Sequence, residues 1–229
     1  MSSSKDLAER LAELARDLQQ HDHADTTAEH VTATVAEWAG PGTEAGISMV
    51  QRRRSVDTIA ATSDIVKRGD ALQYDLHEGP CLDAIWDQPQ VYVEDLAGED
   101  RWPSWGPRAA QELEVASMLC TRLFTNEDTL GALNVYSSQR GAFDEQLRDE
   151  ISTLAAHAAV AVADAVEIQG LTVAVDRRTT IGIAIGVVME RFELDENRAF
   201  DVLKRLSSHR NTKIYDLATD IVATRKLPE

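Results

Sequence analysis

The chain has 229 residues, of which 43% are hydrophobic and 27% are charged, enough for one large or two small domains with at least one buried core. Its formal net charge of −16 argues against a protein whose whole surface binds nucleic acid. We expect no segment to span a bilayer, and MSSSKDLAER lacks the apolar core of a signal peptide. The two cysteines, Cys81 and Cys120, fit a reducing cytosol, so we expect a cytoplasmic protein without membrane attachment.

The charge is unevenly distributed along the chain. Residues 1–170 hold 13 Lys/Arg and 30 Asp/Glu, a net of −17, whereas residues 171–229 hold 10 Lys/Arg and 9 Asp/Glu, a net of +1. Only the C-terminal part can therefore approach a polyanion without strong repulsion, provided that its charges are sorted by face.

The first part of the chain predicts two helices separated by a polar break. Residues 4–20 form the first, with a regular leucine spacing at Leu7, Leu11, Leu14 and Leu18. This spacing is typical of a coiled-coil seam, and equally of an amphipathic helix that packs on its own domain. The polar residues 21–29 predict a break, and residues 30–40 predict the second helix. His21 and His23 lie in the polar stretch and do not make a metal site; no metal or cofactor is expected.

From Ala45 the hydrophobic period changes to that of strands. Strands are predicted over residues 45–51, 55–62, 91–96, 115–124 and 129–138. Helices are predicted from Ser63 to about Tyr74, from Cys81 to Trp86, and within residues 101–113. Two turns are predicted, a solvated tip at Arg52-Arg53-Arg54 and a hairpin turn at Asn126-Glu127-Asp128. This order of elements favours an α+β domain built on an antiparallel sheet.

The same region resembles a GAF domain, a small-molecule sensory module common in signalling proteins. The resemblance is carried by SMVQRRRSVDTIAAT, ALQYDLHEGPCLDAI and TLGALNVYSSQRGAFDEQ. The turn at Glu78-Gly79-Pro80-Cys81 and the element Arg101-Trp102-Pro103 are similar to those of an actinobacterial subset. We assign residues 1–24 to an N-terminal helix and residues 25–165 to the GAF-like domain, whose last helix continues into a linker.

A long helix is predicted to begin near Phe143 and to continue far beyond the sheet region. Apolar residues recur with four-three spacing, and we predict a dimer seam at Leu147, Ile151, Leu154, Ala158, Ala161, Ala165 and Ile168. The spacing favours a parallel homodimer, with a helix packed along its own sheet as the alternative. Gly170 lies beside the seam and is a natural hinge, because glycine costs about 1 kcal/mol relative to alanine inside a helix.

The last part of the chain predicts three short amphipathic helices. Asp195 is placed to cap the second, whose apolar stripe consists of Ala199, Phe200, Leu203 and Leu206. Asn211 or Thr212 can cap the third, which runs to Thr224. Three such helices can bury each other's stripes as a compact all-α unit.

This stretch resembles the ANTAR domain, the three-helix RNA-binding module of bacterial transcription antiterminators. The residues that match the family pattern are Arg178, Ile181, Ala184, Gly186, Val187, Val188, Met189, Ala199, Phe200, Leu203, Ser207 and Asn211. We assign residues 166–229 to this domain. One position departs from the family, since Ile185 stands where Lys or Gln is usual. If that position touches RNA, this chain binds RNA more weakly or with altered specificity.

The polar residues of the three helices predict the RNA-binding surface. The candidates are Arg177, Arg178, Arg191, Arg198, Lys204, Arg205, His209, Arg210, Asn211, Lys213 and Tyr215. Arg and Lys neutralise phosphates, whereas Asn, His and Tyr bond to or stack on unpaired bases. By charge alone the same residues describe an ordinary solvated helix surface. The resemblance implies a dimeric, signal-responsive antitermination regulator that binds nascent-RNA hairpins, and no enzyme.

Two other functions stay open. Cys81 follows a turn at a helix N-terminus, where a thiol pKa can fall, and some GAF-fold proteins are thiol-dependent reductases. Alternatively, the chain is a dimeric sensory or interaction protein whose tail no longer binds RNA, as Ile185 suggests. For an unknown small-molecule ligand, we predict a pocket near Tyr74, Cys81, Trp102 and Trp105. Simple burial in a core is the alternative role for Cys81 and for the tryptophans.

Overall fold

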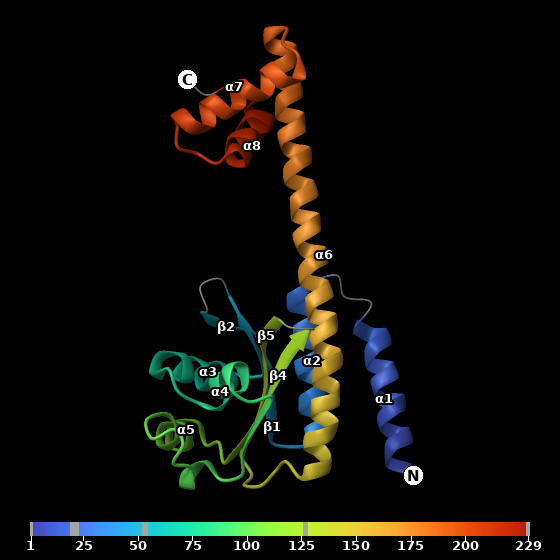
Figure 1. The fold of residues 1–229 in the computed structure, drawn as a ribbon, viewed down its shortest axis with the longest axis vertical. Helices are drawn as coiled ribbons and strands as arrows, with labels where there is room; N and C mark the ends of the chain where they lie inside the picture. Colours follow the sequence, from blue (N-terminus) through green and yellow to red (C-terminus); the bar gives the residue numbers. More distant parts are fainter. Residues whose placement is uncertain (1, 19–22, 52–54, 126–127, 228–229) are drawn as a thin grey trace. The chain divides into compact units, whose positions relative to one another are not determined.

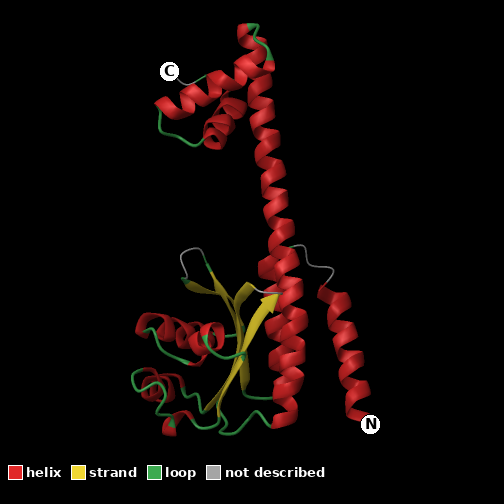
Figure 2. Ribbon diagram, viewed as in Figure 1, coloured by secondary structure: helices red, strands yellow, loops and turns green. Residues whose placement is uncertain are grey.

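A computed structural model describes residues 2–18, 23–51, 55–125 and 128–227, which divide into two compact units, residues 1–167 and 168–229. The predicted tip at residues 52–54 and the first two residues of the predicted turn at 126–128 lie outside the described residues. The N-terminal unit is built on one antiparallel sheet, and the C-terminal unit is all helical (Figures 1 and 2). The α+β fold class is therefore confirmed.

The sheet has the strand order β2-β1-β5-β4-β3, and every neighbouring pair is antiparallel. The strands, in chain order, are β1 (Thr43–Val50), β2 (Val56–Ala61), β3 (Gln90–Val93), β4 (Ser117–Thr125) and β5 (Asp128–Ser137). β5 occupies the centre and needs a glycine there. A Cβ on Gly131 would lie 1.8 Å from the backbone oxygen of Ser48 on β1.

Helices cover both faces of the sheet, as Figure 2 shows. One face is covered by α2 (Ala24–Ala39) and the first part of α6 (Glu145–Phe192), and α1 (Ser2–Leu18) packs on the side of these helices that faces away from the sheet (Figure 1). The other is covered by α3 (Asp64–Leu76), α4 (Pro80–Trp86) and α5 (Trp105–Leu113), with a short 3₁₀ turn at Leu96–Gly98. Each face has its own apolar core, so the unit has three layers.

The two N-terminal helices differ from expectation in one respect. The polar break does not extend to residue 29, because α2 already begins at Ala24. The hydroxyls of Thr26 and Thr27 both donate to the backbone oxygen of His23, at 2.9 Å, which supports the first turn of α2. Leu14 and Leu18 of α1 are buried in the core beneath it, so α1 packs on its own domain.

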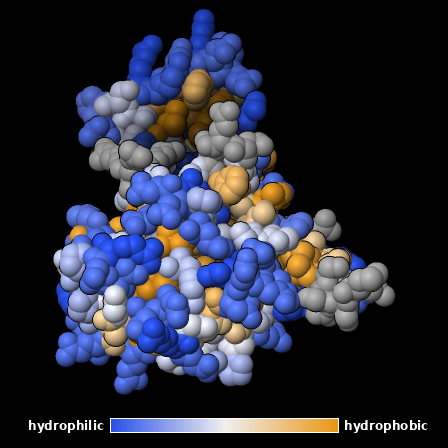
Figure 3. Space-filling view, turned by 60° about the horizontal axis from the view of Figure 1, so that its bottom comes forward, coloured by the Kyte–Doolittle hydropathy of each residue, from blue (hydrophilic) through white to orange (hydrophobic). Residues whose placement is uncertain are grey.

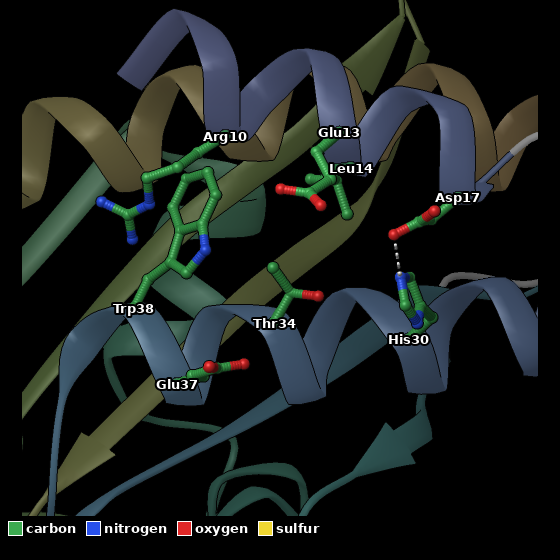
Figure 4. A pocket seen from close by; sticks show the side chains of 8 residues that line it. All are labelled: Arg10, Glu13, Leu14, Asp17, His30, Thr34, Glu37 and Trp38. Atoms are coloured by element: carbon green, nitrogen blue, oxygen red, sulfur yellow. Dashed lines mark ion pairs between the residues drawn. The ribbon is translucent and has the colours of Figure 1, made fainter. Parts of the chain in front are cut away.

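α1 is held against α2 by contacts between polar side chains as well as by leucines. Figure 4 shows the groove between the two helices, about 530 Å³ in volume. At one end the Arg10 guanidinium lies 3.8 Å from the centre of the Trp38 ring, and at the other His30 Nε2 lies 3.9 Å from an Asp17 carboxylate oxygen. Arg10 also approaches Glu150 of α6, at 3.7 Å.

α6 corrects the expectation that no segment is long and apolar enough to cross a membrane. Its 48 residues pass that test by length and composition, because alanine and valine dominate its middle. The test is weak for a single helix, and a helix that packs on its own domain also passes it. Between Leu147 and Val162 most of its apolar residues pack into the core of the N-terminal unit, although Val160 is exposed. The helix continues unbroken through Gly170.

The C-terminal unit consists of the end of α6, α7 (Glu196–His209) and α8 (Ile214–Thr224). Asp195 caps α7 as predicted, since its carboxylate accepts from the backbone N–H of Arg198 at 2.9 Å. α8 begins two residues later than expected, after Lys213, which makes no side-chain cap. Asn211 and Thr212 belong to the turn between the two helices instead.

Candidate nucleic-acid interface and buried polar cluster

A polar cluster lies within the otherwise apolar core between the sheet and α3–α5. Its centre is Asp70 of α3, which is fully buried. The carboxylate accepts hydrogen bonds from Tyr136 OH at 2.5 Å, Thr58 Oγ1 at 2.8 Å and Asn134 Nδ2 at 3.0 Å. Burial raises the pKa of Asp70 from 3.8 to about 6, and the hydrogen bonds limit that rise.

Ser48 of β1 connects two further residues to this cluster. Tyr74 OH donates to Ser48 Oγ at 2.6 Å, and Cys81 Sγ lies 3.4 Å from the same oxygen. Asn134 Nδ2 donates to Cys81 Sγ at 3.2 Å, whereas Asn134 Oδ1 is buried and has no hydrogen-bond partner among the residues that the structure describes. Burial, followed by the nearby Asp70, raises the pKa of the Cys81 thiol to about 12. The thiol is therefore neutral and a weak nucleophile.

The predicted ligand-pocket residues fall into two groups. Tyr74 and Cys81 meet at Ser48, as described above. Trp102 and Trp105 instead pack edge to face, with ring centres 6.0 Å apart, and both are buried in the core. Each indole N–H has an acceptor, Asp83 Oδ2 at 3.1 Å for Trp102 and the backbone oxygen of Gly69 at 3.3 Å for Trp105. The tryptophans thus have the structural role of core residues.

Sequence reasoning missed five members of the cluster, Ser48, Thr58, Asp70, Asn134 and Tyr136. One signal was available, because Ser48 and Asn134 interrupt runs of apolar residues in predicted strands. The partners of Asp70 were not readable, since Asn134 and Tyr136 lie 64 and 66 positions away in the chain.

The core of the C-terminal unit accounts for much of the motif described above. Its buried residues are Ala184, Val188, Ala199, Leu203, Leu217, Ala218 and Ile221. Ile185 is partly buried and packs against this core, whereas Phe200 is 37% exposed and lies beside Lys204. Most apolar motif positions therefore hold the three helices together.

Two polar motif residues build the turn between α7 and α8. Ser207 Oγ donates to the backbone oxygen of Thr212 at 2.6 Å, and the backbone N–H of Thr212 donates to the Ser207 oxygen at 3.1 Å. Asn211 adopts a left-handed conformation, with φ of 50°, which asparagine tolerates better than most residues. These two residues thus set the direction in which α8 leaves α7.

The turn places Tyr215 of α8 beside a basic residue of α6. Arg177 of α6 lies 5.4 Å from the centre of the Tyr215 ring at the start of α8. We define the junction end by these two residues, Arg178, and the predicted RNA-binding residues of the second half of α7 and of the α7–α8 turn, namely Arg177, Arg178, Lys204, Arg205, His209, Arg210, Asn211, Lys213 and Tyr215. All of them except Tyr215 are exposed, and Tyr215 is half-buried. Acidic residues at this end are Asp176, Asp201 and Asp216.

The remaining two predicted RNA-binding residues lie away from the junction end. Arg191 donates to the backbone oxygen of Arg225, just after α8, at 3.3 Å. Arg198 pairs with Asp195 at 3.4 Å, at the start of α7. This second end also carries Glu190, Glu193 and Glu196, so its charge is mixed. The structure therefore separates the predicted set into a cationic end and a mixed one.

Lys204 of the junction end has a close acidic partner on α7. Its Nζ lies 2.7 Å from Asp201 Oδ1 and 5.0 Å from the centre of the Phe200 ring. The hydrogen bond from Lys204 lowers the pKa of Asp201. Exposed pairs of this kind contribute little stability, so a phosphate can replace Asp201 as the partner of Lys204.

The predicted dimer seam divides along α6. Ile151, Leu154, Ala158 and Ala165 are buried within the N-terminal unit, and Leu147 and Ala161 pack at the edge of the same core. Ile168 is 45% exposed. Other apolar side chains of α6 are also exposed, namely Val160 and Val166 before it and Leu171, Val173 and Val175 after it. Much of the surface visible in Figure 3 is hydrophilic, which makes an exposed apolar stretch unusual.

The chain matches two protein-family models. The GAF domain model matches residues 21–163, and the ANTAR domain model matches residues 169–222. No curated protein matches the chain.

Solved structures match the N-terminal part. The GAF domain of an Acinetobacter phosphoenolpyruvate-protein phosphotransferase has a TM-score of 0.56 at 15% identity, covering 72% of this chain and 97% of that one. Free methionine-R-sulfoxide reductase from Neisseria meningitidis, in complex with its substrate, has a TM-score of 0.57 at 16% identity, covering 70% and 90%. A GAF domain of such a phosphotransferase from Coxiella burnetii gives 0.55 at 14%, covering 72% and 96%.

At these identities the likeness shows the fold alone, and it agrees with the five-stranded sheet flanked by helices. The two family matches follow one another along the chain in the order typical of a regulator rather than an enzyme. The chain therefore belongs to the GAF-domain family and carries an ANTAR domain after it, the architecture of a GAF–ANTAR regulator.

Proposed function

We propose that this protein is a cytoplasmic, signal-responsive antitermination regulator whose ANTAR domain binds hairpins in nascent RNA. Binding holds the transcript in a form that excludes the terminator, so transcription continues. The observation that carries the proposal is the junction end, where exposed cations occur on or next to all three helices and Arg177 lies beside the half-buried Tyr215. Cations beside an aromatic ring suit a loop whose bases are unpaired and whose backbone is anionic.

The charge distribution supports the junction end over the rest of the surface. Residues 1–170 carry a net charge of −17, which repels a polyanion. Within the C-terminal unit, Arg191 and Arg198 are engaged with neighbouring groups of the same chain at the mixed end. Long-range attraction of RNA is therefore focused on the junction end.

The exposed stretch of α6 supports a homodimer. Because most apolar residues of α6 up to Val162 pack in their own unit, a partner helix would contact Ile168, Leu171 and Val175, which are 45%, 60% and 62% exposed. Pairing such residues across two helices removes apolar surface from water, at roughly 25 cal/mol per Å². Two ANTAR domains on one particle would also bind two hairpins with an increased effective concentration.

The proposal is tested by gel shifts with tandem RNA hairpins that carry hexanucleotide loops. The Lys204→Ala/Arg205→Ala variant should bind at least tenfold more weakly than wild type, because two phosphate-neutralising groups are lost. The matched control is Arg191→Ala/Arg198→Ala, which removes the same charge from the mixed end and should change affinity by less than about twofold.

The salt dependence of binding gives a second measurement. The slope of log affinity against log salt should decrease by between one and two in the Lys204→Ala/Arg205→Ala variant and stay unchanged in the control. Equal losses in both variants, or binding that ignores the loop bases, would contradict the proposal. Sedimentation analysis tests the homodimer, and a monomer at the concentrations of the gel shift would contradict that part.

A further inference from the structure

Two exposed glycines lie one helical turn apart in α6, within the C-terminal unit. Neither Gly182 nor Gly186 has a positive φ, so the backbone conformation does not require glycine at these positions. A Cβ built on either glycine would face open space, with no packing neighbour within 4 Å among the described residues. Glycine also destabilises a helix interior relative to alanine. A second backbone that approaches this face from outside the chain would account for both residues.

The two glycines continue the exposed part of the predicted dimer seam. Six exposed residues recur at intervals of four and three along α6, namely Ile168, Thr172, Val175, Thr179, Gly182 and Gly186. This spacing keeps one side of a helix facing a partner helix. The side chains decrease in size from Ile168 to the glycines, so two helices paired along this line can approach most closely within their C-terminal units.

A largely apolar groove of about 650 Å³ lies beside Gly186, between α6 and the end of α8. Its lining residues are Ile183, Gly186, Val187, Glu190, Arg191, Val222 and Arg225. Ile183 is 51% exposed. In a twofold-symmetric contact the same surface is used by both copies, so an exposed side chain and a groove on one surface can complete each other.

The charges at this groove distinguish between two kinds of occupant. Glu190, Arg191 and Arg225 are all exposed, so the rim carries both signs of charge. A second copy of the chain would bring the same residues in a symmetric arrangement, and Glu190 could then meet an arginine of the other copy. An RNA backbone would instead meet the Glu190 carboxylate, which repels phosphate. The mixed rim therefore favours a second copy of this chain over RNA.

We propose that the two ANTAR domains of the homodimer contact each other along Gly182 and Gly186. The α6 helices pack closely at the glycines, and Ile183 of each copy enters the groove of the other. The inference rests on the homodimer of the proposed function and assigns the place where its two C-terminal units meet.

This contact leaves the junction ends accessible to RNA. Arg177 lies two residues from both Val175 and Thr179, which corresponds to about 200° of rotation around the helix axis. The cationic side of α6 is thus nearly opposite the line that carries the glycines. Two copies joined along that line therefore direct their junction ends outwards, and each can bind its own hairpin.

Sedimentation of the full chain tests the contact through glutamine substitutions. Glutamine is uncharged and a good helix former, and its length would hold the two helices apart. Gly182→Gln and Gly186→Gln should each raise the dimer dissociation constant by about tenfold or more, because the contacts between the closely packed helices are lost. Circular dichroism should show that both variants keep the helix content of wild type.

Gly170→Gln is the matched control. It adds the same side chain to the same helix, at a glycine that is also exposed and open but lies off the line. Its dissociation constant should differ from that of wild type by less than about twofold, as for most exposed substitutions. Equal dissociation constants in all three glutamine variants would overturn the inference and leave the homodimer intact. A monomeric wild type would contradict both.

A disulfide test needs no change at the glycines. Thr179→Cys places a thiol on the line, whereas Cys81 and Cys120 are buried. On mild oxidation it should form a disulfide between two copies, seen on a non-reducing gel, because a disulfide requires two closely spaced backbones. Ala174→Cys, at an exposed position off the line, should not. Equal cross-linking by the two variants would overturn the inference.

A gel shift with a single RNA hairpin separates this contact from RNA binding. Gly186→Gln should bind one hairpin within about twofold of wild type, because the junction end is unchanged. A tenfold weaker affinity with an intact dimer would overturn the inference and assign the glycine face to RNA. If wild type binds no RNA, the proposed function fails, while sedimentation and cross-linking still decide on the contact.

Discussion

The two units of this chain place their polar side chains in opposite ways. The N-terminal unit buries a carboxylate, Asp70, within a set of hydrogen bonds, whereas the C-terminal unit exposes cations at the junction end. A buried polar group has a high free-energy cost unless each partner is in place, so its geometry is tightly determined. Exposed cations have little cost and adapt to a partner. The fixed geometry of the buried cluster is therefore suited to responding to a small structural change, and the exposed cations of the second unit are suited to contacting a large ligand.

The largest effect on stability should follow from removing the carboxylate at the centre of the buried cluster. In Asp70→Ala, hydrogen bonds from Tyr136, Thr58 and Asn134 lose their acceptor in a site closed to water. We expect the N-terminal unit to lose about 3 to 5 kcal/mol of unfolding free energy, measured by urea denaturation. Asp75→Ala, at an exposed position of the same helix, is the control. A loss below about 1 kcal/mol for Asp70→Ala would show that the cluster contributes little.

The second effect concerns pH and compares wild type with Asp70→Asn. The pKa of Asp70 is raised in the folded state, from 3.8 to about 6, so folding favours the protonated carboxyl. The contribution of the protonated Asp70 carboxyl to the free energy of unfolding is fully present below pH 3.8 and is lost as the pH rises through about 6. Two pKa units correspond to about 3 kcal/mol. The stability of wild type relative to Asp70→Asn should therefore increase as the pH falls from 7 to 4, and a constant difference would refute the assignment.

The third effect tests the junction end at its aromatic residue. Tyr215→Leu keeps an apolar side chain at a half-buried position but removes the ring beside Arg177. If the ring stacks on an unpaired base, the affinity for hairpin RNA should fall by about tenfold, or 1.4 kcal/mol. Tyr215→Phe keeps the ring and should bind nearly as wild type. Similar binding by both variants would exclude stacking at this position.

The smallest effect is an expected absence of chemistry at Cys81. Because the thiol is fully buried and its pKa is raised to about 12, it should not react with a thiol reagent until the unit unfolds. Guanidinium-unfolded protein, in which both cysteines are accessible, is the positive control. Cys81→Ser and wild type should both lack turnover of free methionine sulfoxide. Turnover that depends on Cys81 would restore the reductase alternative.

Elements with a regular apolar period were predictable from the sequence. The stripe of α7 is an example, since Ala199 and Leu203 are buried where the period places them. The same period places Phe200 in the buried stripe, but its side chain is 37% exposed. Phe200 lies at the edge of the stripe, and the sequence pattern does not show how far the neighbouring helices cover that edge. The start of α2 was missed because His23 and two threonines, weak helix formers, begin it through hydroxyl-to-backbone bonds.

The two candidate sites also differ in how far they could be predicted from the sequence. Cations of the junction end were named from the sequence, because surface charge can be read from residue types alone. Their division into two ends was not, since it depends on Arg177 meeting Tyr215 and Arg191 meeting Arg225. Asp70 was missed entirely, because a carboxylate in a core contradicts the local pattern and is explained only by partners on distant strands.

Most residues of the ANTAR motif have a structural role, which affects how ANTAR domains are identified in genome sequences. Ala184, Val188, Ala199 and Leu203 fill the core, and Ser207 and Asn211 shape a turn. A search profile dominated by such residues detects whether a sequence adopts the three-helix fold. It carries little information on whether that fold still binds RNA. ANTAR domains that bind RNA and those that have lost RNA binding would therefore obtain similar scores. Only the residues at exposed positions would distinguish the two groups.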